Sequence, residues 1–352
     1  MSRLDDLGGW KQLFTVLGSG AELSPELSAA AVGTVLDGDA TPAQLGGFLI
    51  GLRARGGVHA AETAAMVDEM LAHAAPLDLG ERTAVAVDIV GTGGSKLRQD
   101  VAFNISTTAC FVVAGAGVPV CKHGNRKASS SSGSTDVLEA LGVAVELDGP
   151  AVARCVAEAG LGFAFARVFH PAMRHAGPVR AELGVPTVFN ILGPLSHPAH
   201  VSRQVIGVAD ESLMPMVIEV LRQRHAPRAM VVHGSDGLDE LTLTGPSVVS
   251  ELRDGVVRTY DVIPQHLGLT AAVIEDVGVG SPEANAEAVR TLLAGGEGAR
   301  RDIVLLNAAA GLVVGGVVDD LAAGLVLAAD SIDSGRAADA LEALISVSNA
   351  PA

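Results

Sequence analysis

The chain is poor in aromatic residues and in positive charge. Only 3% of its 352 residues are aromatic, with a single Trp and a single Tyr, although 49% are hydrophobic. The core must therefore pack mainly Ala, Val, Leu and Gly, which suits closely packed α/β layers. Lys and Arg number 24 against 40 Asp and Glu, and the net charge of −16 argues against a nucleic-acid partner, which requires a basic face. A small anionic substrate remains compatible, because a local basic pocket is enough to bind it.

Cysteine and long hydrophobic runs are also scarce. The three cysteines are Cys110, Cys121 and Cys155. Their odd number and unpaired spacing predict neither a disulfide framework nor a zinc site, and we interpret them as small buried apolar residues. The apolar stretches 105–121 and 303–328 are both interrupted, the first by two glycines and a proline, the second by two aspartates and several glycines. We therefore expect no membrane span and, because the N-terminus does not resemble a signal peptide, a cytoplasmic protein.

The first 75 residues carry helix signals and no strand signal. Ser24 followed by Pro25, and Thr41 followed by Pro42, are typical helix starts, with the cap residue before a proline. The segment His59–Ala74 gathers its apolar residues on one helical face. This part of the chain predicts a small all-helical unit.

From Thr83 onward, short apolar strands alternate with helices. The strand candidates are Ala84–Val90, Val118–Cys121, Val143–Glu146, Gly162–Ala166, Val205–Gly207, Arg228–Val232 and Ile303–Leu306. The helix candidates between them include Asp136–Leu141, Pro150–Ala159, Ser212–Gln223 and Glu283–Ala294. Such alternation predicts a mostly parallel sheet covered by helices, and sheets of this kind bind ligands beyond the carboxyl ends of their strands.

Three polar loops adjoin apolar segments between residues 88 and 142. They are Gly91-Thr92-Gly93-Gly94, the helix start Asn104 with Ser106 and Thr107, and Lys122-His123-Gly124-Asn125-Arg126 with the serine run that follows it. Glycines let a backbone approach a phosphate, free N–H groups at a helix start point at it, and Lys122 and Arg126 add charge. A tight turn or an ordinary helix cap would explain any one of these loops alone. Their repetition favours an anion site.

Four further segments extend this pattern along the chain. The full set reads GTGG, FNIST, KHGNR, SGSTDVLEALG, FHPAMRH, VPTVFNILGPL and DGLDELT. In this order, from about residue 12 to about residue 325, the chain resembles the anthranilate phosphoribosyltransferase family. The resemblance implies an α/β protein with a small discontinuous all-helical domain and a large α/β domain whose central sheet is mostly parallel. The helical domain would comprise 1–78, completed by about 170–195, and the large domain 79–169 with 196–352.

The resemblance also implies a reaction. It is transfer of the 5-phosphoribosyl group from 5-phosphoribosyl 1-pyrophosphate (PRPP) to the amine of anthranilate, with release of pyrophosphate, in tryptophan biosynthesis. Displacement at the anomeric carbon builds positive charge on the ribose and negative charge on the pyrophosphate, so we expect positioning and electrostatics to supply the catalysis, with no side chain as acid or base. Mg²⁺, as two ions, and a homodimer formed through the helical domain are implied as well.

Residues matching the family's segments are the site candidates. The large domain would bind the donor PRPP. The residues implied for this role are Gly91, Thr92, Gly93, Gly94, Asn104, Ser106, Thr107, Lys122, Asn125, Ser129, Ser130, Ser131 and Ser134. Those implied for Mg²⁺ are Ser106, Asp239 and Glu240. Adjacent carboxylates suit Mg²⁺, which takes few protein ligands and shares the rest with water and substrate, although a solvated acidic turn also explains the Asp239-Glu240 pair.

The candidates implied for the acceptor come from three parts of the chain. They are Gly91, His123, Asn125, Met173, His175 and Arg180. Arg180 would hold the carboxylate of anthranilate, for which the planar guanidinium is the natural partner. A surface position on a helix is the alternative for Arg180, and ordinary packing is the alternative for Met173.

The chain departs from the family's pattern near the glycine loop. Ser95 stands where the family has Asp, and Ser95–Phe103 is a longer segment than the family has before Asn104. Asp100, within that segment, is a candidate to supply the missing carboxylate. Arg167 replaces a usual proline beside the acceptor entrance. These changes keep other functions open, namely a homologous transferase for a different amine in a specialised pathway, a nucleoside phosphorylase, and a non-catalytic ligand-binding homologue.

Overall fold

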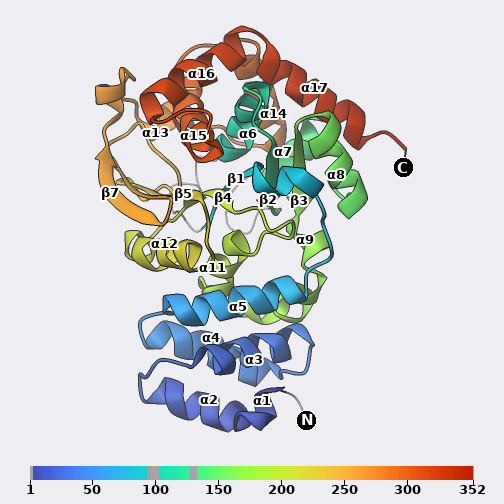
Figure 1. The fold of residues 1–352 in the computed structure, drawn as a ribbon, viewed down its shortest axis with the longest axis vertical. Coiled ribbons are helices and arrows are strands. Elements are labelled where there is room, and N and C mark those ends of the chain that lie inside the picture. Colours follow the sequence, from blue (N-terminus) through green and yellow to red (C-terminus); the bar gives the residue numbers. More distant parts are fainter. Residues whose placement is uncertain (1–2, 94, 96–102, 127–132, 352) are drawn as a thin grey trace.

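A stack of helices forms one end of the molecule (Figure 1). The computed structural model describes residues 3–93, 95, 103–126 and 133–351. The stack contains α1 (Arg3–Asp6), α2 (Gly9–Gly18), α3 (Pro25–Leu36), α4 (Pro42–Ala54) and α5 (Ala60–Ala72). Ser24 caps α3 by accepting the backbone N–H of Leu27, and Thr41 caps α4 in a reciprocal pair with Gln44. The helix starts predicted before Pro25 and Pro42 are confirmed.

A seven-stranded mixed sheet forms the centre of the rest of the molecule. Its strands are β1 (Val87–Gly91), β2 (Val120–Gly124), β3 (Leu161–Phe165), β4 (Arg203–Gly207), β5 (Arg228–Gly234), β6 (Ser247–Arg253) and β7 (Val256–Val262). The spatial order is β3-β2-β1-β4-β5-β6-β7, parallel from β3 to β5 and antiparallel from β5 to β7. The chain leaves β1 for β2 on one side and later returns to β4 on the other. This topological switch at β1 is where open α/β sheets bind ligands.

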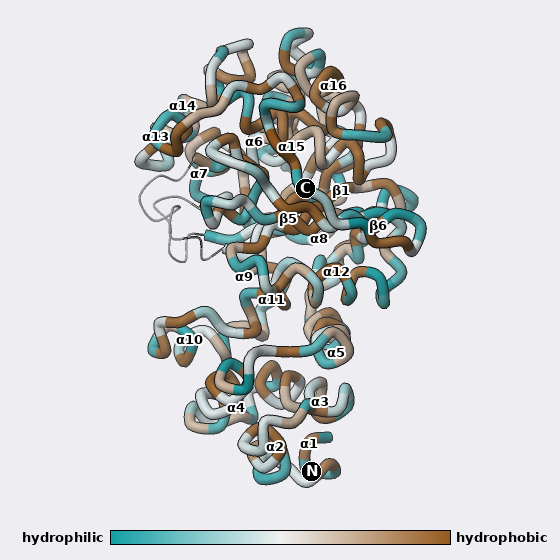
Figure 2. The backbone as a smooth tube through the Cα atoms, turned by 90° about the vertical axis from the view of Figure 1, so that its left-hand side faces the viewer, coloured by the Kyte–Doolittle hydropathy of each residue, from teal (hydrophilic) through white to brown (hydrophobic). Residues whose placement is uncertain are grey.

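Helices cover both faces of the sheet. They are η1 (Gly80–Ala84), α6 (Ile105–Gly115), α7 (Ser134–Ala140), α8 (Gly149–Glu158), η4 (Glu211–Leu213), α12 (Met214–Gln223), η5 (Pro264–Leu267), α13 (Ile274–Val277), α14 (Pro282–Leu293), α15 (Ala299–Gly315), α16 (Leu321–Asp333) and α17 (Arg336–Ser348). Successive residues of β4 serve different cores, because Val205 packs with α6 and α15 whereas Ile206 packs with α12 and the N-terminal helices. Figure 2 shows brown, hydrophobic segments of the tube beside the label of β5, within the sheet.

One segment of the chain returns from the sheet to the N-terminal helices. It contains α9 (Ala166–Phe169), η3 (Pro171–His175), α10 (Gly177–Leu183) and α11 (Val188–Leu195). Phe189 and Leu192 of α11 share one buried core with Leu49 of α4 and Met66 of α5. Figure 1 shows α11 between α5 and the sheet. The returning segment therefore lies at the junction between the helical stack and the sheet.

Two strand predictions are wrong, and one hairpin is missing from the prediction. Val143–Glu146 is irregular, and Ile303–Leu306 lies inside α15, whose residues from Ile303 to Val314 are all buried. A helix buried on every side has no apolar stripe, so its pattern does not differ from that of a buried strand. The unpredicted β6–β7 hairpin turns at Asp254-Gly255, both with positive φ, which is the usual Asp-Gly hairpin signal. Among the described residues, none of the helices has the length and apolar character needed to cross a membrane.

A buried ion pair ties the loops of the helical stack together. The side chains of Arg55 and Glu62 form it and are each 2% exposed. Glu62 also accepts the backbone N–H groups of Leu23 and His59, and Arg55 donates to the carbonyl oxygen of Ala21 at 2.8 Å. The carboxylate and the guanidinium are therefore both compensated, and removal of either one leaves the other as a buried charge.

We predict that Glu62→Ala lowers the free energy of unfolding by about 3 kcal/mol, because Arg55 would remain buried without its partner. Urea denaturation followed by circular dichroism measures this change. The control is Glu342→Ala, which breaks the exposed pair with Arg290 and should leave the denaturation midpoint almost unchanged. Equal shifts for the two variants would show that the burial of the Arg55–Glu62 pair has no special weight.

Candidate active site

Two glycines at strand ends make room for Asp239. Gly91 ends β1 and Gly207 ends β4, on neighbouring strands. A Cβ atom on Gly91 would lie 2.2 Å from Oδ2 of Asp239, and one on Gly207 would lie 1.8 Å from its carbonyl oxygen. No side chain other than hydrogen fits at these positions while the loop after β5 stays where it is. The loop that carries Asp239 and Glu240 therefore lies directly against the carboxyl ends of β1 and β4.

The acidic pair joins the loop after β5 to the other two polar segments. Oδ2 of Asp239 accepts the backbone N–H of Gly93 at 2.8 Å, and Oε1 of Glu240 accepts the backbone N–H of Ser106 at 3.0 Å. Asp239 is 1% exposed and Glu240 is 4% exposed. The alternative of a solvated acidic turn is excluded by this burial. The carboxylates instead bring together the glycine loop and the start of α6.

The loop after β5 is braced by its own polar residues. Asp236 accepts the backbone N–H of Leu238 at 3.0 Å and the hydroxyls of Thr242 and Thr244, both at 2.6 Å. Gly237, which follows Asp236, has a φ of 84°. The carboxylate of Asp236 thus closes a turn of the kind that Asp favours, with glycine at the position of positive φ.

Asn307 of α15 binds the same loop through Leu241. Asn307 is not among the site candidates predicted from the sequence. Its Oδ1 accepts the backbone N–H of Leu241 at 3.0 Å, and its Nδ2 donates to the carbonyl oxygen of Leu241 at 2.9 Å. The side chain is 1% exposed. Asn307 could have been noticed in the sequence as a single amide within an apolar run, because a buried polar group needs hydrogen-bond partners.

Lys122 brings a positive charge to the same place. It is 3% exposed in the middle of β2, and its Nζ donates to the carbonyl oxygen of Ile89 and, at 3.3 Å, to Oγ of Ser106. Thr92, in the glycine loop, donates its backbone N–H to the carbonyl oxygen of Gly207 at 2.9 Å. Asn104 precedes α6, and Thr107 is buried in its first turn. These donor candidates therefore surround one end of β1.

The metal candidates fit Mg²⁺ by their chemistry. Asp239 and Glu240 are adjacent in the chain, Glu240 accepts the backbone N–H of Ser106, and all three residues are buried. Mg²⁺ is commonly held by one or two carboxylates together with water and substrate oxygens. Among the described residues, no group of three or more His, Cys, Asp or Glu could enclose a metal ion without such help.

His123 and Asn125 lie at the end of β2, facing the returning segment. Nδ1 of His123 is 3.2 Å from the carbonyl oxygen of Gly193, at the end of α11. Burial, with smaller contributions from neighbouring His170 and His197, holds the pKa of His123 well below its usual range. Asn125 is exposed, and its backbone carbonyl oxygen accepts a hydrogen bond from the hydroxyl of Ser134 at 3.1 Å. This bond links the loop after β2 to the start of α7.

Arg126 does not face the loops that surround the end of β1. Its guanidinium binds both carboxylate oxygens of Glu139, at 2.6 and 2.7 Å, and lies over the ring of Phe165. The Glu139 carboxylate is the first cause of a raised pKa of Arg126. The positive charge of Arg126, predicted to contribute to an anion site, is therefore paired with Glu139 and holds the loop against α7.

Arg180 lies on α10 against α11. Its Nη2 donates to Oδ1 of Asn190 at 3.3 Å, and its guanidinium lies 5.6 Å from the centre of the Phe189 ring. Burial lowers the pKa of Arg180 below its ordinary value. Arg180 is therefore half-buried and contacts two residues of α11, and its role in binding a carboxylate stays a prediction.

Met173 and His175 lie on η3, beside the N-terminal helices. Met173 packs against the core that includes α3 to α5. The ring of His175 lies against Gly38, where an added Cβ would be 2.8 Å from its Nδ1. The structure therefore places both residues on the helical side of the junction.

Several candidates lie outside the described residues. They are Gly94, Ser129, Ser130 and Ser131, together with Asp100 of the longer segment. Ser95, which replaces the family's Asp, is 3% exposed, and Arg167 on α9 is exposed.

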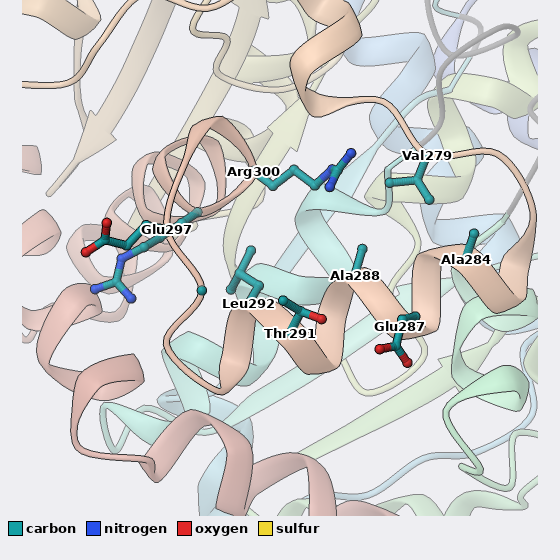
Figure 3. A pocket seen from close by; sticks show the side chains of 10 residues that line it. Val279, Ala284, Glu287, Ala288, Thr291, Leu292, Glu297 and Arg300 are labelled. Atoms are coloured by element: carbon teal, nitrogen blue, oxygen red, sulfur yellow. The ribbon is translucent and has the colours of Figure 1, made fainter.

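A cavity of about 270 Å³ lies between α14 and the loop before α15. Figure 3 shows Arg300 and Glu287 among its lining residues. None of the residues that line this cavity is among the site candidates. The candidate site is instead formed by the loops at the switch point of the sheet.

Two family models match the chain. One, described as "Glycosyl transferase family, helical bundle domain", matches residues 11–74, and the other, described as "Glycosyl transferase family, a/b domain", matches residues 83–338. The chain is 50% identical over 340 residues to the anthranilate phosphoribosyltransferase of Arthrobacter sp. (strain FB24), covering 95% of this chain and 94% of that protein. It is 49% identical over 345 residues to that of Rhodospirillum rubrum, with 97% and 96% covered.

Solved structures of the same kind of enzyme are similar over nearly the whole chain. Anthranilate phosphoribosyltransferase from Thermus thermophilus gives a TM-score of 0.89 at 42% identity, covering 96% of this chain and 99% of that chain. The Saccharomyces cerevisiae enzyme in complex with PRPP and Mg gives 0.81 at 28% identity, with 92% of each chain covered. The same enzyme in complex with 4-fluoroanthranilate gives 0.83 at 26% identity, with 97% and 98% covered.

We predict that Asn307→Ala loosens the loop after β5 without unfolding the protein. The backbone N–H and carbonyl of Leu241 would both lose a buried partner, so amide exchange across residues 234–242 should accelerate by about tenfold. Hydrogen–deuterium exchange measured by mass spectrometry tests this. Asn349→Ala, which removes an exposed amide from the end of α17, is the control and should leave the loop unchanged. Acceleration spread evenly over the whole chain would contradict a local role for Asn307.

Proposed function

This chain belongs to the anthranilate phosphoribosyltransferase family, and we propose that it transfers the 5-phosphoribosyl group of PRPP to the amine of anthranilate, releasing pyrophosphate, in tryptophan biosynthesis. One observation of the structure carries the assignment. The buried Asp239-Glu240 pair fastens the glycine loop to the start of α6 at the switch point of the sheet. This arrangement surrounds one small volume with phosphate-binding and cation-binding groups.

The proposed donor site uses positioning and charge. The backbone of Gly91, Thr92 and Gly93 would lie close to the donor's phosphates at the end of β1, because glycines allow such an approach, and the start of α6 adds the groups of Asn104, Ser106 and Thr107. Lys122 contributes a buried positive charge against the negative charge that develops on the leaving pyrophosphate. Asn125 and Ser134 would contact the donor from the end of β2, together with Gly94 and Ser129 to Ser131. The reaction then needs no side chain as acid or base.

Ser106, Asp239 and Glu240 would hold Mg²⁺. When bound, Mg²⁺ would neutralise charge on the pyrophosphate as it leaves. Two ions are proposed, because the two carboxylates are held by different segments, Asp239 by Gly93 and Glu240 by Ser106. The backbone contacts fix the position of both carboxylates, whose oxygens are of the kind that Mg²⁺ binds.

The proposed acceptor site lies between the end of β2 and the returning segment. Arg180 would bind the carboxylate of anthranilate, with its guanidinium already oriented by Asn190 and Phe189. Gly91, His123 and Asn125 would contact the amine side, with Met173 and His175 on the helical side. A shift of η3 away from Gly38 would be needed for His175 to reach the acceptor.

The larger organisation is proposed on the same basis. A helical domain of 1–78 completed by about 170–195, and a large domain of 79–169 with 196–352, are supported by the core that α11 shares with α4 and α5. A homodimer through the helical domain is supported by the exposed side chains of Leu7 and Ile50, at 38% and 41%. We also propose a cytoplasmic location.

The assay that tests the function follows the fluorescence of anthranilate in the presence of protein, Mg²⁺ and PRPP. Loss of emission that requires both Mg²⁺ and PRPP is the expected result. Binding of PRPP in calorimetry without loss of anthranilate would reject anthranilate as the acceptor. It would favour a transferase for another amine, in keeping with Ser95 in place of the family's Asp. Phosphate-dependent cleavage of a nucleoside would reject the transferase assignment.

We predict that Arg180→Ala raises the KM for anthranilate by roughly 10- to 100-fold, because a charge-assisted contact with the carboxylate is lost. The KM for PRPP should change by no more than about twofold. Steady-state kinetics with each substrate varied in turn gives both values. Arg174→Ala, on the exposed side of η3, is the matched control. An equal rise of both KM values would remove Arg180 from the acceptor site.

We predict that Asp239→Asn combined with Glu240→Gln lowers Mg²⁺-dependent turnover by roughly 100-fold or more, because the charge that attracts the cation is removed while the shape is kept. The same assay measures turnover over a range of Mg²⁺ concentrations. The control is Glu287→Gln combined with Glu297→Gln, which removes the same charge from the surface near α14. Near-normal turnover by the Asp239 and Glu240 variant would exclude these residues as metal ligands.

A further inference from the structure

The end of α11 is held by side chains from three other elements. The carbonyl oxygen of Gly193 is 3.2 Å from Nδ1 of His123, on β2. That of Pro194 accepts Nε2 of Gln204, on β4, at 3.0 Å, and that of Ser196 is 3.0 Å from Nε2 of His170, between α9 and η3. The carbonyl oxygen of Gly193 also accepts the backbone N–H of the cap residue Ser196 at 3.1 Å. The last carbonyl groups of a helix commonly bond groups outside it, so these side chains help to fix how α11 ends.

Asp88 connects two of those three side chains. It lies within β1 with no exposed surface. Its Oδ1 accepts the backbone N–H of His123 at 3.0 Å, and its Oδ2 accepts Nε2 of Gln204 at 3.3 Å. One carboxylate therefore reaches β2 on one side and β4 on the other.

The reason for this contact lies in the divergence of β1 and β2. β1 pairs with β4 over five residues, whereas its registered pairing with β2 is confined to Val87 and Val120. Beyond that pair the strands separate, and the N–H of His123 lacks a backbone carbonyl on β1. The carboxylate of Asp88 takes the place of that carbonyl.

Burial and the neighbours of Asp88 act on its ionisation in opposite directions, and the effect of burial is the larger. Burial raises its pKa to about 7, while Lys122 and the hydrogen bonds from His123 and Gln204 act in the opposite direction. Both of its partners donate, which suits a carboxylate with two accepting oxygens.

The hydrogen bonds also define the tautomer of His123. A carbonyl oxygen accepts only, so Nδ1 of His123 carries the hydrogen that bonds Gly193, and Nε2 is left as an acceptor. His123 is 4% exposed, and its Nε2 has no hydrogen-bond partner among the described residues. A buried acceptor of this kind calls for a donor from a ligand. An aryl amine supplies such an N–H group.

We propose that Asp88 is a positioning residue for the acceptor amine, because its carboxylate fixes the backbone of His123 directly and, through Gln204, the end of α11 that orients the imidazole. The proposal rests on the transferase function inferred above and deepens it. Asp88 touches neither substrate, and its effect reaches the amine through Nε2 of His123. Gln204 is the second positioning residue, because it joins Asp88 to the end of α11.

Asp88→Asn tests the proposal with little change of volume. The amide keeps an oxygen for the N–H of His123 but sets its own NH₂ against the NH₂ of Gln204. We expect the KM for anthranilate to rise by about tenfold and kcat to fall by a similar factor, with the KM for PRPP changed by less than about twofold. Asp261→Asn, on the exposed edge strand β7, is the matched control and should behave as the unmodified protein.

Two further variants separate the two arms of Asp88. Gln204→Leu keeps the Asp88–His123 bond and removes the bonds of Gln204 to Asp88 and to Pro194, so a smaller rise of the same KM is expected. Asp88→Asn combined with Gln204→Glu restores an acceptor opposite the amide and returns the charge, so it should recover part of the loss. Unchanged anthranilate KM in both Asp88→Asn and Gln204→Leu would overturn the proposal, as would parallel rises for both substrates.

A spectroscopic measurement is independent of turnover. With ¹⁵N-labelled histidine, NMR should show His123 as the Nδ1–H tautomer in the unmodified protein and a changed tautomer mixture in Asp88→Asn. A retained tautomer in Asp88→Asn, together with a lowered melting temperature, would reduce Asp88 to a structural role and overturn the proposal. If the unmodified protein does not consume anthranilate, the proposed function fails, and the tautomer result still decides whether Asp88 sets His123.

Discussion

The contact of Asp239 with the ends of β1 and β4 is the constraint on which the site depends. The space for it exists only because Gly91 and Gly207 lack side chains, since a Cβ on either would overlap the aspartate. Once the loop after β5 occupies that space, Asp239 reaches the N–H of Gly93 and Glu240 reaches that of Ser106. Three segments far apart in the sequence thereby become one surface. Asn307 of α15 fixes the position of the loop after β5 through two hydrogen bonds with the backbone of Leu241.

Buried carboxylates join distant segments both in the site and in the helical stack. Asp239 accepts a backbone N–H group of the glycine loop, and Glu240 accepts one at the start of α6. Glu62 of the helical stack accepts the backbone N–H groups of Leu23 and His59 and is also paired with Arg55. Exposures are only a few per cent in both places. A buried carboxylate accepts several donors at once, so it can fix loops that no secondary structure connects.

The sequence predicts those parts whose signal is local. The caps at Ser24 and Thr41 and the glycine loop after β1 are short patterns with a fixed physical meaning, and the structure shows helix starts and a strand end there. The strand predicted at Ile303–Leu306 is wrong because α15 is buried on every side, and this erased the helical period. Asn307 lies in the same run, and its role depends on a contact with Leu241 that no local pattern records. Asp88 and Gln204 escaped notice for the same reason, since a polar residue in a strand acquires meaning only from its neighbouring strands.

The end of α11 links the geometry of the two parts of the molecule. Its carbonyl groups are bound by His123 and Gln204 from the sheet and by His170 from the start of the returning segment. Any movement of the helical stack that carries α11 must therefore either carry these side chains with it or break their bonds. Burial lowers the pKa of His170 and of neighbouring His197 to about 4 and holds the pKa of His123 well below its usual range. The ring of His123 lies 5.0 Å from that of His170 and 5.9 Å from that of His197, between ring centres. Because neutral rings can pack this closely without charge repulsion near neutral pH, the junction between the two parts of the molecule can lie directly against His123.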